Sequence, residues 1–152
     1  GVQDSFNKWL TLAANLGVIA GIIFLALEVN QNNLLMESQT RANIASQISN
    51  QLYQSAESDY LEIFTSENFD GLTQLEITRR NRYLQSNLRM WENIHYQYRN
   101  GLYDESEFIK EREVWRNAVN GNMRFIICNS QSSNLFSEEF FSELESLLDQ
   151  AC

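Results

Sequence analysis

A long run of apolar residues lies near the beginning of the chain. Residues 10–27 contain no charged side chain, Trp9 precedes them, and Val29 follows after a single glutamate. A helix rises 1.5 Å per residue, so about 20 such residues span about 30 Å, the thickness of the hydrocarbon core of a bilayer. The pattern therefore predicts a single membrane-spanning anchor helix within residues 1–30, with Lys8 and Trp9 at one membrane interface.

Two other interpretations of this run are a buried helix of a soluble protein and a cleaved signal peptide. In a soluble bundle, residues 10–27 would form the buried central helix. A cleaved signal peptide is disfavoured, because no small-x-small cleavage site follows the run. For a membrane span, charge leaves the orientation open, since Lys8 precedes the run and Arg41 is the first basic residue after it.

Small residues recur at every fourth position inside the run. Ala13, Gly17 and Gly21 form a small-xxx-small stripe with a GxxxG pattern, which lets two helix backbones approach closely in lipid. We expect Asn15 and Thr11 near the same side, where they could form hydrogen bonds between helices. The stripe predicts a homo-oligomer or a subunit of a larger membrane complex. The alternative is that these small residues pack beneath the protein's own helices.

The remaining sequence has the three-to-four spacing of amphipathic helices. The chain contains no proline, and no glycine occurs between Gly21 and Gly71, so one helix is expected from near Ser5 to Phe64. A loop is expected over residues 65–71. The apolar stripe of the second half of this helix comprises Ala45, Ile48, Leu52, Ala56, Tyr60 and Ile63.

Capping signals predict three further helices. Thr73 and Glu76 have the form of a capping box, and Asn100 and Gly101 stop the helix that it opens. Asp104 and Glu107 form another capping pair, whose helix ends around residues 120–122, and Ser137 caps the last helix. The apolar faces are Ile77, Leu84, Leu88, Trp91, His95 and Tyr98, then Phe108, Trp115 and Val119, and finally Phe140, Phe141, Leu144, Leu147, Leu148 and Ala151.

These elements define the expected architecture. Residues 123–128 add a final helical turn or, as the alternative, a short strand. The predicted fold class is all-α, with a transmembrane helix that continues into a long amphipathic helix and packs with three to four further helices. The expected domains are a membrane anchor at 1–30 and a helical bundle at 31–152.

The net charge of −9 is distributed unevenly along the chain. Residues 28–70 carry seven acids against one base, whereas five arginines and two glutamates lie within residues 73–100. The acidic pI of about 4.5 argues against general nucleic-acid binding, which normally uses a basic face. The arginines either pack among acidic neighbours or form an anion or lipid-headgroup site, for which the candidates are Arg79, Arg80 and Arg82.

One Glu-x-x-His pattern has the spacing of metal ligands on a helix. Glu92 and His95 share a helical face, but a di-iron bundle needs two such pairs, and the chain has one histidine. A mixed site with an acid from another helix stays open, and so does a ligand pocket of Trp91, Glu92, His95 and Tyr98. The other interpretation is a histidine packed in the core. Without a phosphate loop or a Ser-His-Asp set, we predict no metal and no cofactor, and favour a non-enzymatic role.

Two cysteines, Cys128 and Cys152, leave two possibilities open. A disulfide would fasten the last helix and would imply an oxidising compartment. Two free thiols are the alternative.

The chain resembles a broad group of uncharacterised bacterial proteins in which a hydrophobic helix is followed by a small helical domain. The resembling segments are 17–32 (GVIAGIIFLALEVNQN), 91–104 (WENIHYQYRNGLYD) and 135–140 (LFSEEF). Members often place an arginine before the Gln-Asn pair, which would favour a cytoplasmic domain, but Asn30 stands there in this chain. The resemblance implies a membrane anchor followed by a helical domain, and it implies no activity. Together with the apolar run, it leads us to expect a single-pass protein of the bacterial inner membrane with lipid as a partner.

Overall fold

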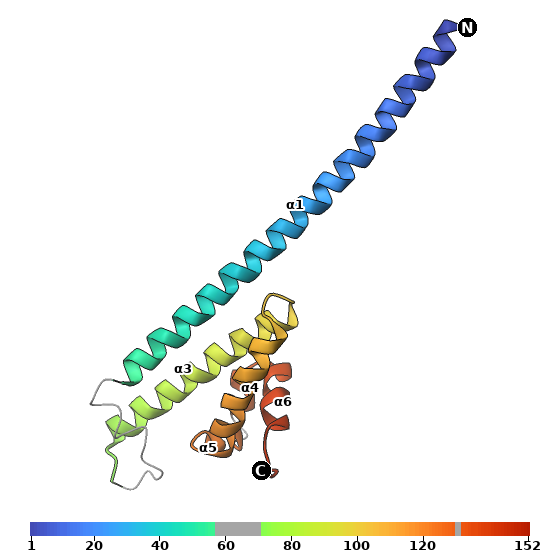
Figure 1. Cartoon of the computed structure of the whole chain (residues 1–152). Helices are drawn as coiled ribbons and strands as arrows, with labels where there is room; N and C mark the ends of the chain where they lie inside the picture. The colour runs from blue at the N-terminus through green and yellow to red at the C-terminus, as the bar shows by residue number, and fades with distance from the viewer. Residues whose placement is uncertain (57–70, 130–131) are drawn as a thin grey trace. The chain divides into compact units, whose positions relative to one another are not determined.

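The computed structural model describes residues 1–56, 71–129 and 132–152. This described part is helical and contains no strand. Its elements are α1 (Val2–Ser55), α3 (Gln74–Arg99), α4 (Glu105–Asn120), α5 (Arg124–Ile127), the 3-10 helix η1 (Ser132–Leu135) and α6 (Glu138–Ser146). Figure 1 labels the α-helices. The all-α prediction is therefore confirmed.

Helix α1 is one uninterrupted helix of 54 residues. It passes from the apolar run into the polar sequence after it, as expected for a stretch without proline and without glycine after Gly21. The predicted continuation to Phe64, with Tyr60 and Ile63, lies outside the described residues. The same holds for all but the last residue of the expected loop at 65–71.

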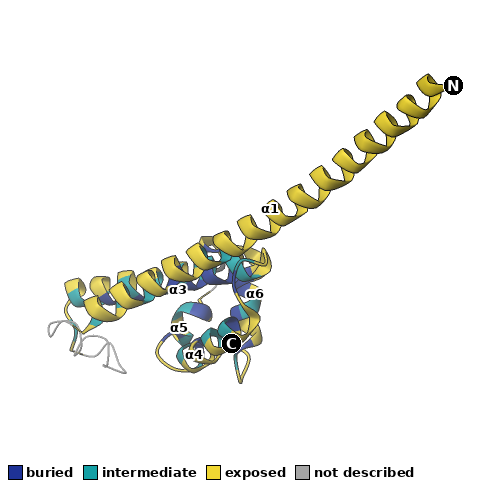
Figure 2. Cartoon of the chain, turned by 45° about the horizontal axis from the view of Figure 1, so that its top comes forward, coloured by how far each residue is buried: buried dark blue, intermediate teal, exposed yellow. Residues whose placement is uncertain are grey.

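The chain divides into two compact units, Gly1–Gln39 and Thr40–Cys152, and each is described by itself. The first unit consists of the first part of α1, and its large apolar side chains are exposed (Figure 2). Trp9 is 70% exposed, Ile19 54% and Phe24 64%. Because contacts within the chain do not define a membrane boundary, the division at residue 30 stays a prediction.

The second unit buries its apolar side chains between helices. The core comprises Leu84, Leu88, Trp91 and Ile94 of α3, Phe108, Trp115 and Val119 of α4, and Phe140, Phe141 and Leu144 of α6, together with Ile44, Tyr103, Met123, Ile127, Phe136 and Leu147. The faces predicted for α3 and α4 are confirmed at most positions. Ile77 and Tyr98 are half-buried. Arg80, a candidate for the anion site, is buried with the core, which the spacing did not predict.

The buried face of the second half of α1 differs from the predicted one. Ile44 is 2% exposed and Ile48 is half-buried, whereas Ala45 and Leu52 are exposed. Neighbouring helical positions point about 100° apart, so the helix is turned by one position from the expected stripe. Ile48 belongs to both the predicted and the observed face, so the difference lies at Ile44, whose side chain buries more apolar surface than that of Ala45 would.

The boundaries of α3 follow the predicted signals. The Thr73 hydroxyl accepts a hydrogen bond from the Glu76 N–H at 3.3 Å, and Glu76 Oε2 accepts one from the Thr73 N–H at 2.7 Å. At the other end, Gly101 has a φ of +71°, which favours glycine. The N–H groups of Leu102 and Gly101 donate to the carbonyls of Gln97 and Tyr98, which forms a Schellman motif.

The later boundaries agree in part. Asp104 caps α4 by accepting from the N–H groups of Ser106 and Glu107. Residues 124–127 form the helical alternative, α5, rather than a strand. Helix α6 begins after Ser137 as predicted, but the Ser137 side chain makes no capping hydrogen bond. The helix ends at Ser146, so Leu147, Leu148 and Ala151 follow it instead of extending its apolar side.

Candidate interaction and ligand sites

The small-residue stripe lies on the exposed surface of α1. Ala13, Gly17 and Gly21 are exposed, and a Cβ atom added to either glycine would meet nothing within 4 Å. Asn15 does not share this face, because two helical positions differ by about 200°. The Thr11 hydroxyl donates to the carbonyl of Asn7 at 2.9 Å, inside its own helix. The stripe therefore offers close backbone approach without the polar side chains expected beside it.

The four residues of the predicted ligand pocket separate into two environments. Trp91 stacks on Trp115 with ring centroids 5.5 Å apart, and Tyr98 stacks on Phe108 at 3.9 Å. These two aromatic residues belong to the packing between α3 and α4. Glu92 and His95, by contrast, line a surface cavity of about 410 Å³.

The cavity is formed by the second half of α3 and the beginning of α6. Besides Glu92 and His95, it is lined by Tyr96, Arg99, Asn100, Ser137 and Glu139. Arg99 and Glu139 form an ion pair across it at 3.5 Å. One cavity thus combines a carboxylate, an imidazole and an ion pair, which suits a small polar molecule better than an apolar one.

Glu92 connects α3 to α6. Its Oε1 accepts a hydrogen bond from the Ser137 N–H at 2.6 Å, and its Oε2 accepts one from Arg89 at 2.8 Å. Partial burial acts to raise the pKa of Glu92, but the hydrogen bonds from Ser137 and Arg89 outweigh it, and the pKa is lowered. Glu92 is therefore a carboxylate at neutral pH, occupied in holding the first turn of α6.

His95 lies between aromatic rings at the edge of the cavity. It is 8% exposed, and its ring centroid lies 6.1 Å from that of Phe108 and 5.8 Å from that of Phe140. Burial lowers the pKa of His95 and outweighs the opposite effect of the Glu143 and Glu139 carboxylates. The imidazole is therefore neutral at pH 7. Within the described ranges, no group of three His, Cys, Asp or Glu side chains lies close enough to hold a metal ion.

The three candidate arginines of the anion site do not share a face. Arg79 and Arg82 are exposed, whereas Arg80 is 2% exposed, with its guanidinium 5.9 Å from the centre of the Phe125 ring. Arg80 serves the packing between α3 and α5. The exposed pair could contact an anion, but the cluster of three predicted from spacing is not formed.

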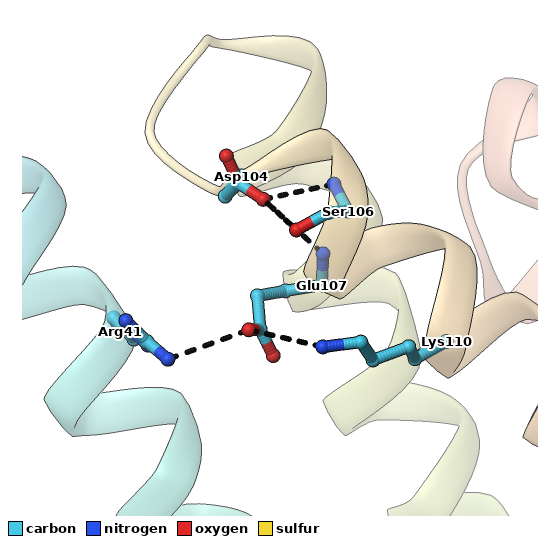
Figure 3. Close-up of polar contacts among 5 residues, drawn as sticks. All are labelled: Arg41, Asp104, Ser106, Glu107 and Lys110. Atoms are coloured by element: carbon cyan, nitrogen blue, oxygen red, sulfur yellow. Dashed lines mark hydrogen bonds and ion pairs between the residues drawn. The ribbon is translucent and has the colours of Figure 1, made fainter.

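One polar cluster was not predicted as a site. Arg41 donates to Glu107 at 3.4 Å, and Lys110 donates to the same carboxylate oxygen at 3.3 Å (Figure 3). Glu107 thus pairs with two cations instead of completing a capping box with Asp104, whose carboxylate accepts from Ser106 and the Glu107 N–H. The signal in the sequence was the three-residue spacing of Arg41 and Ile44, which places both on the same side of α1.

A second unpredicted cluster fastens residues 147–152. Asn120 donates to the carbonyl of Leu147 and accepts from the Asp149 N–H, both at 2.9 Å. Arg124 donates to the carbonyls of Gln150 and Ala151 at 3.0 and 3.2 Å. Cys128 then forms a disulfide with Cys152, with the Cα atoms 5.3 Å apart. The four-residue spacing of positions 120, 124 and 128 was the available signal.

Comparisons with protein-family models, with curated proteins and with solved structures found no match to this chain. Among the described helices, α1 is long and apolar enough to cross a membrane. The candidate sites therefore rest on this chain's own residues.

Proposed function

We propose that this chain is a single-pass protein of a bacterial inner membrane that associates with itself or with a larger membrane complex as a structural or interaction subunit. It performs no catalysis in this proposal. The observation that carries it is the apolar window of α1, in which none of the residues is buried.

The exposed window fits a bilayer in length and in chemistry. Eighteen helical residues rise about 27 Å, close to the hydrocarbon thickness of about 30 Å. Side chains such as Ile19, Ile22 and Phe24 are 54–64% exposed, a surface that lipid tails solvate and water does not. Burial in a soluble bundle would need a partner for every side of this helix, which favours the membrane interpretation.

The small-residue stripe supports association inside the membrane. Association of helices in lipid depends on close packing, and the open space over Gly17 and Gly21 allows a second backbone to approach. Residues on the opposite face, such as Ala26, would then contact lipid. A substitution at Ala26 therefore serves as a matched control for substitutions at Gly17 and Gly21.

The experiment measures oligomer size in mild detergent. Gly17→Leu and Gly21→Leu should shift the protein from an oligomer toward the monomer, because leucine side chains separate the two backbones. Ala26→Leu adds the same side chain about 180° from Gly17 and should leave the size unchanged. An unchanged size for both glycine variants would remove the stripe from the proposal. A shift with Ala26→Leu would mean that association is not specific to this face.

A second candidate function is binding of a small polar molecule in the cavity of Glu92 and His95. The cavity of about 410 Å³ with its Arg99–Glu139 pair favours it. Its metal-binding version is tested by elemental analysis of the purified protein, followed by titration with zinc. Metal bound by the wild type and lost in both Glu92→Gln and His95→Leu would support the metal version. Absence of bound metal in both measurements would eliminate the metal version.

A further inference from the structure

The segment 147–152 is held in place by bonds that do not involve sulfur. The Asn120 side chain bonds the backbone of Leu147 and Asp149, and the Arg124 guanidinium bonds the carbonyls of Gln150 and Ala151. These contacts come from the end of α4 and from α5, and they lead the chain directly toward Cys128. Cys152 is therefore positioned next to Cys128 by polar contacts and not by the disulfide alone.

The positions of the two cysteines suit disulfide formation. Their Cα atoms are 5.3 Å apart, within the usual range for disulfides, and both residues are exposed. A thiol pair that is adjacent and accessible is oxidised wherever an oxidant is available. In a reducing cytoplasm, the same pair is kept as thiols.

We propose that Cys128 and Cys152 are oxidised by a thiol oxidase outside the cytoplasm, so that residues 40–152 lie on the outer side of the membrane and Lys8 lies on the cytoplasmic side. This inference rests on the proposed membrane span. It supplies the orientation that the flanking charges, Lys8 and Arg41, leave open.

The reaction is a thiol–disulfide exchange with a protein disulfide as oxidant. One thiolate attacks the oxidase disulfide and forms a mixed disulfide, and the second thiolate then displaces the oxidase sulfur. Cys128 and Cys152 together lose two protons and two electrons as their S–S bond forms. The oxidase disulfide accepts them and becomes two thiols.

Pairing of Arg41 on the surface of residues 40–152 is consistent with this orientation. Arg41 is the first basic residue after the span and donates to Glu107 of α4. The Arg41 guanidinium thus pairs with a carboxylate of the domain, while Lys8 precedes the span. Basic residues next to a span favour the cytoplasmic side, and an orientation with Lys8 inside satisfies this preference.

The test labels cysteines of the full-length chain in spheroplasts with a membrane-impermeant maleimide, before and after lysis. Cys128→Ser leaves Cys152 as a single thiol, which should be labelled fully before lysis. Asn7→Cys in a Cys128→Ser/Cys152→Ser background should be labelled only after lysis. Because loss of the disulfide could affect folding, Asn117→Cys in the wild-type background provides an exposed thiol on a disulfide-bonded domain, and it too should react before lysis.

A second readout tests the disulfide itself. The wild type, acid-trapped from cells, should take up no maleimide until it is reduced, and should take up two in a host that lacks exported thiol oxidase. Labelling of Cys152 or of Asn117→Cys only after lysis would overturn the orientation. Free thiols in the unreduced wild type would overturn the proposed oxidation of Cys128 and Cys152. Recovery of the protein in the soluble fraction would instead contradict the membrane span, which fractionation detects independently of labelling.

Discussion

The units Gly1–Gln39 and Thr40–Cys152 both carry large apolar side chains on helices. The first unit leaves these side chains exposed, whereas the second buries many of them in a core. In the first unit, side chains such as Ile19 and Phe24 remain more than half exposed, and the apolar residues surround the helix. In the second unit, Trp115, Phe140 and Leu144 are 0% exposed and lie on single helical faces. A one-sided stripe is satisfied by the chain's own helices, whereas an all-round apolar surface requires another solvent or another chain.

The largest effect that tests this contrast is expected in the aromatic core. Trp115→Ala removes a side chain that stacks on Trp91 and meets Phe108 and Phe140 edge-on. The free energy of unfolding should fall by about 3–5 kcal/mol, measured by urea denaturation of the full chain in detergent. Val114→Ala, at a position that is 57% exposed, is the control and should change it by less than about 0.5 kcal/mol. Equal losses would mean that this core does not stabilise the second unit.

A charge introduced into the first unit should reduce membrane insertion rather than the stability of the fold. Ile19→Arg places a cation at the middle of the apolar window, which costs about 2.5–3.5 kcal/mol of insertion free energy in a membrane. The fraction of protein that sediments with membranes should therefore fall. Leu52→Arg, on the same helix at a position that is 64% exposed outside the window, should leave this fraction unchanged. If Ile19→Arg also leaves it unchanged, the window is not a membrane span.

Predictions from sequence were accurate where a feature depends on neighbouring residues. The capping box of Thr73 and Glu76 forms within a few residues, and so does the stop at Gly101. Both therefore follow from local rules of hydrogen bonding and backbone conformation. The apolar faces of α3 and α4 were also predictable, because a strong three-to-four repeat leaves one choice of face.

The parts that escaped prediction depend on packing between distant segments. The choice of Ile44 over Ala45 as the buried position of α1 depends on α3 and α4, and the burial of Arg80 depends on Phe125 of α5. Spacing along one helix cannot show which arginine turns inward. The disulfide was open for the same reason, since it depends on Asn120 and Arg124 guiding residues 147–152.

A smaller effect is expected at the first turn of α3. Thr73→Ala removes the hydroxyl that caps the Glu76 N–H, so unfolding should become easier by about 1 kcal/mol. Thr78→Ala makes the same substitution inside the helix, where alanine is the better helix former, and should not destabilise. Urea denaturation of both variants measures the difference. A loss with Thr78→Ala as large as that with Thr73→Ala would show that capping is not the cause.

The smallest effect concerns the pH dependence that His95 contributes. Because burial lowers the pKa of His95 in the folded state, the unfolded chain binds the proton more tightly, and stability must fall as pH drops below the ordinary histidine pKa of about 6.5. Urea midpoints measured at several pH values from about 7.5 downward should decrease in the wild type. His95→Leu should decrease less over the same range, since the carboxylates with lowered pKa values, Glu92 and Glu139, are common to both proteins. Parallel curves would show that the pKa of His95 is the same in the folded second unit as in the unfolded chain, which would break the contrast between a buried and an exposed region at this residue.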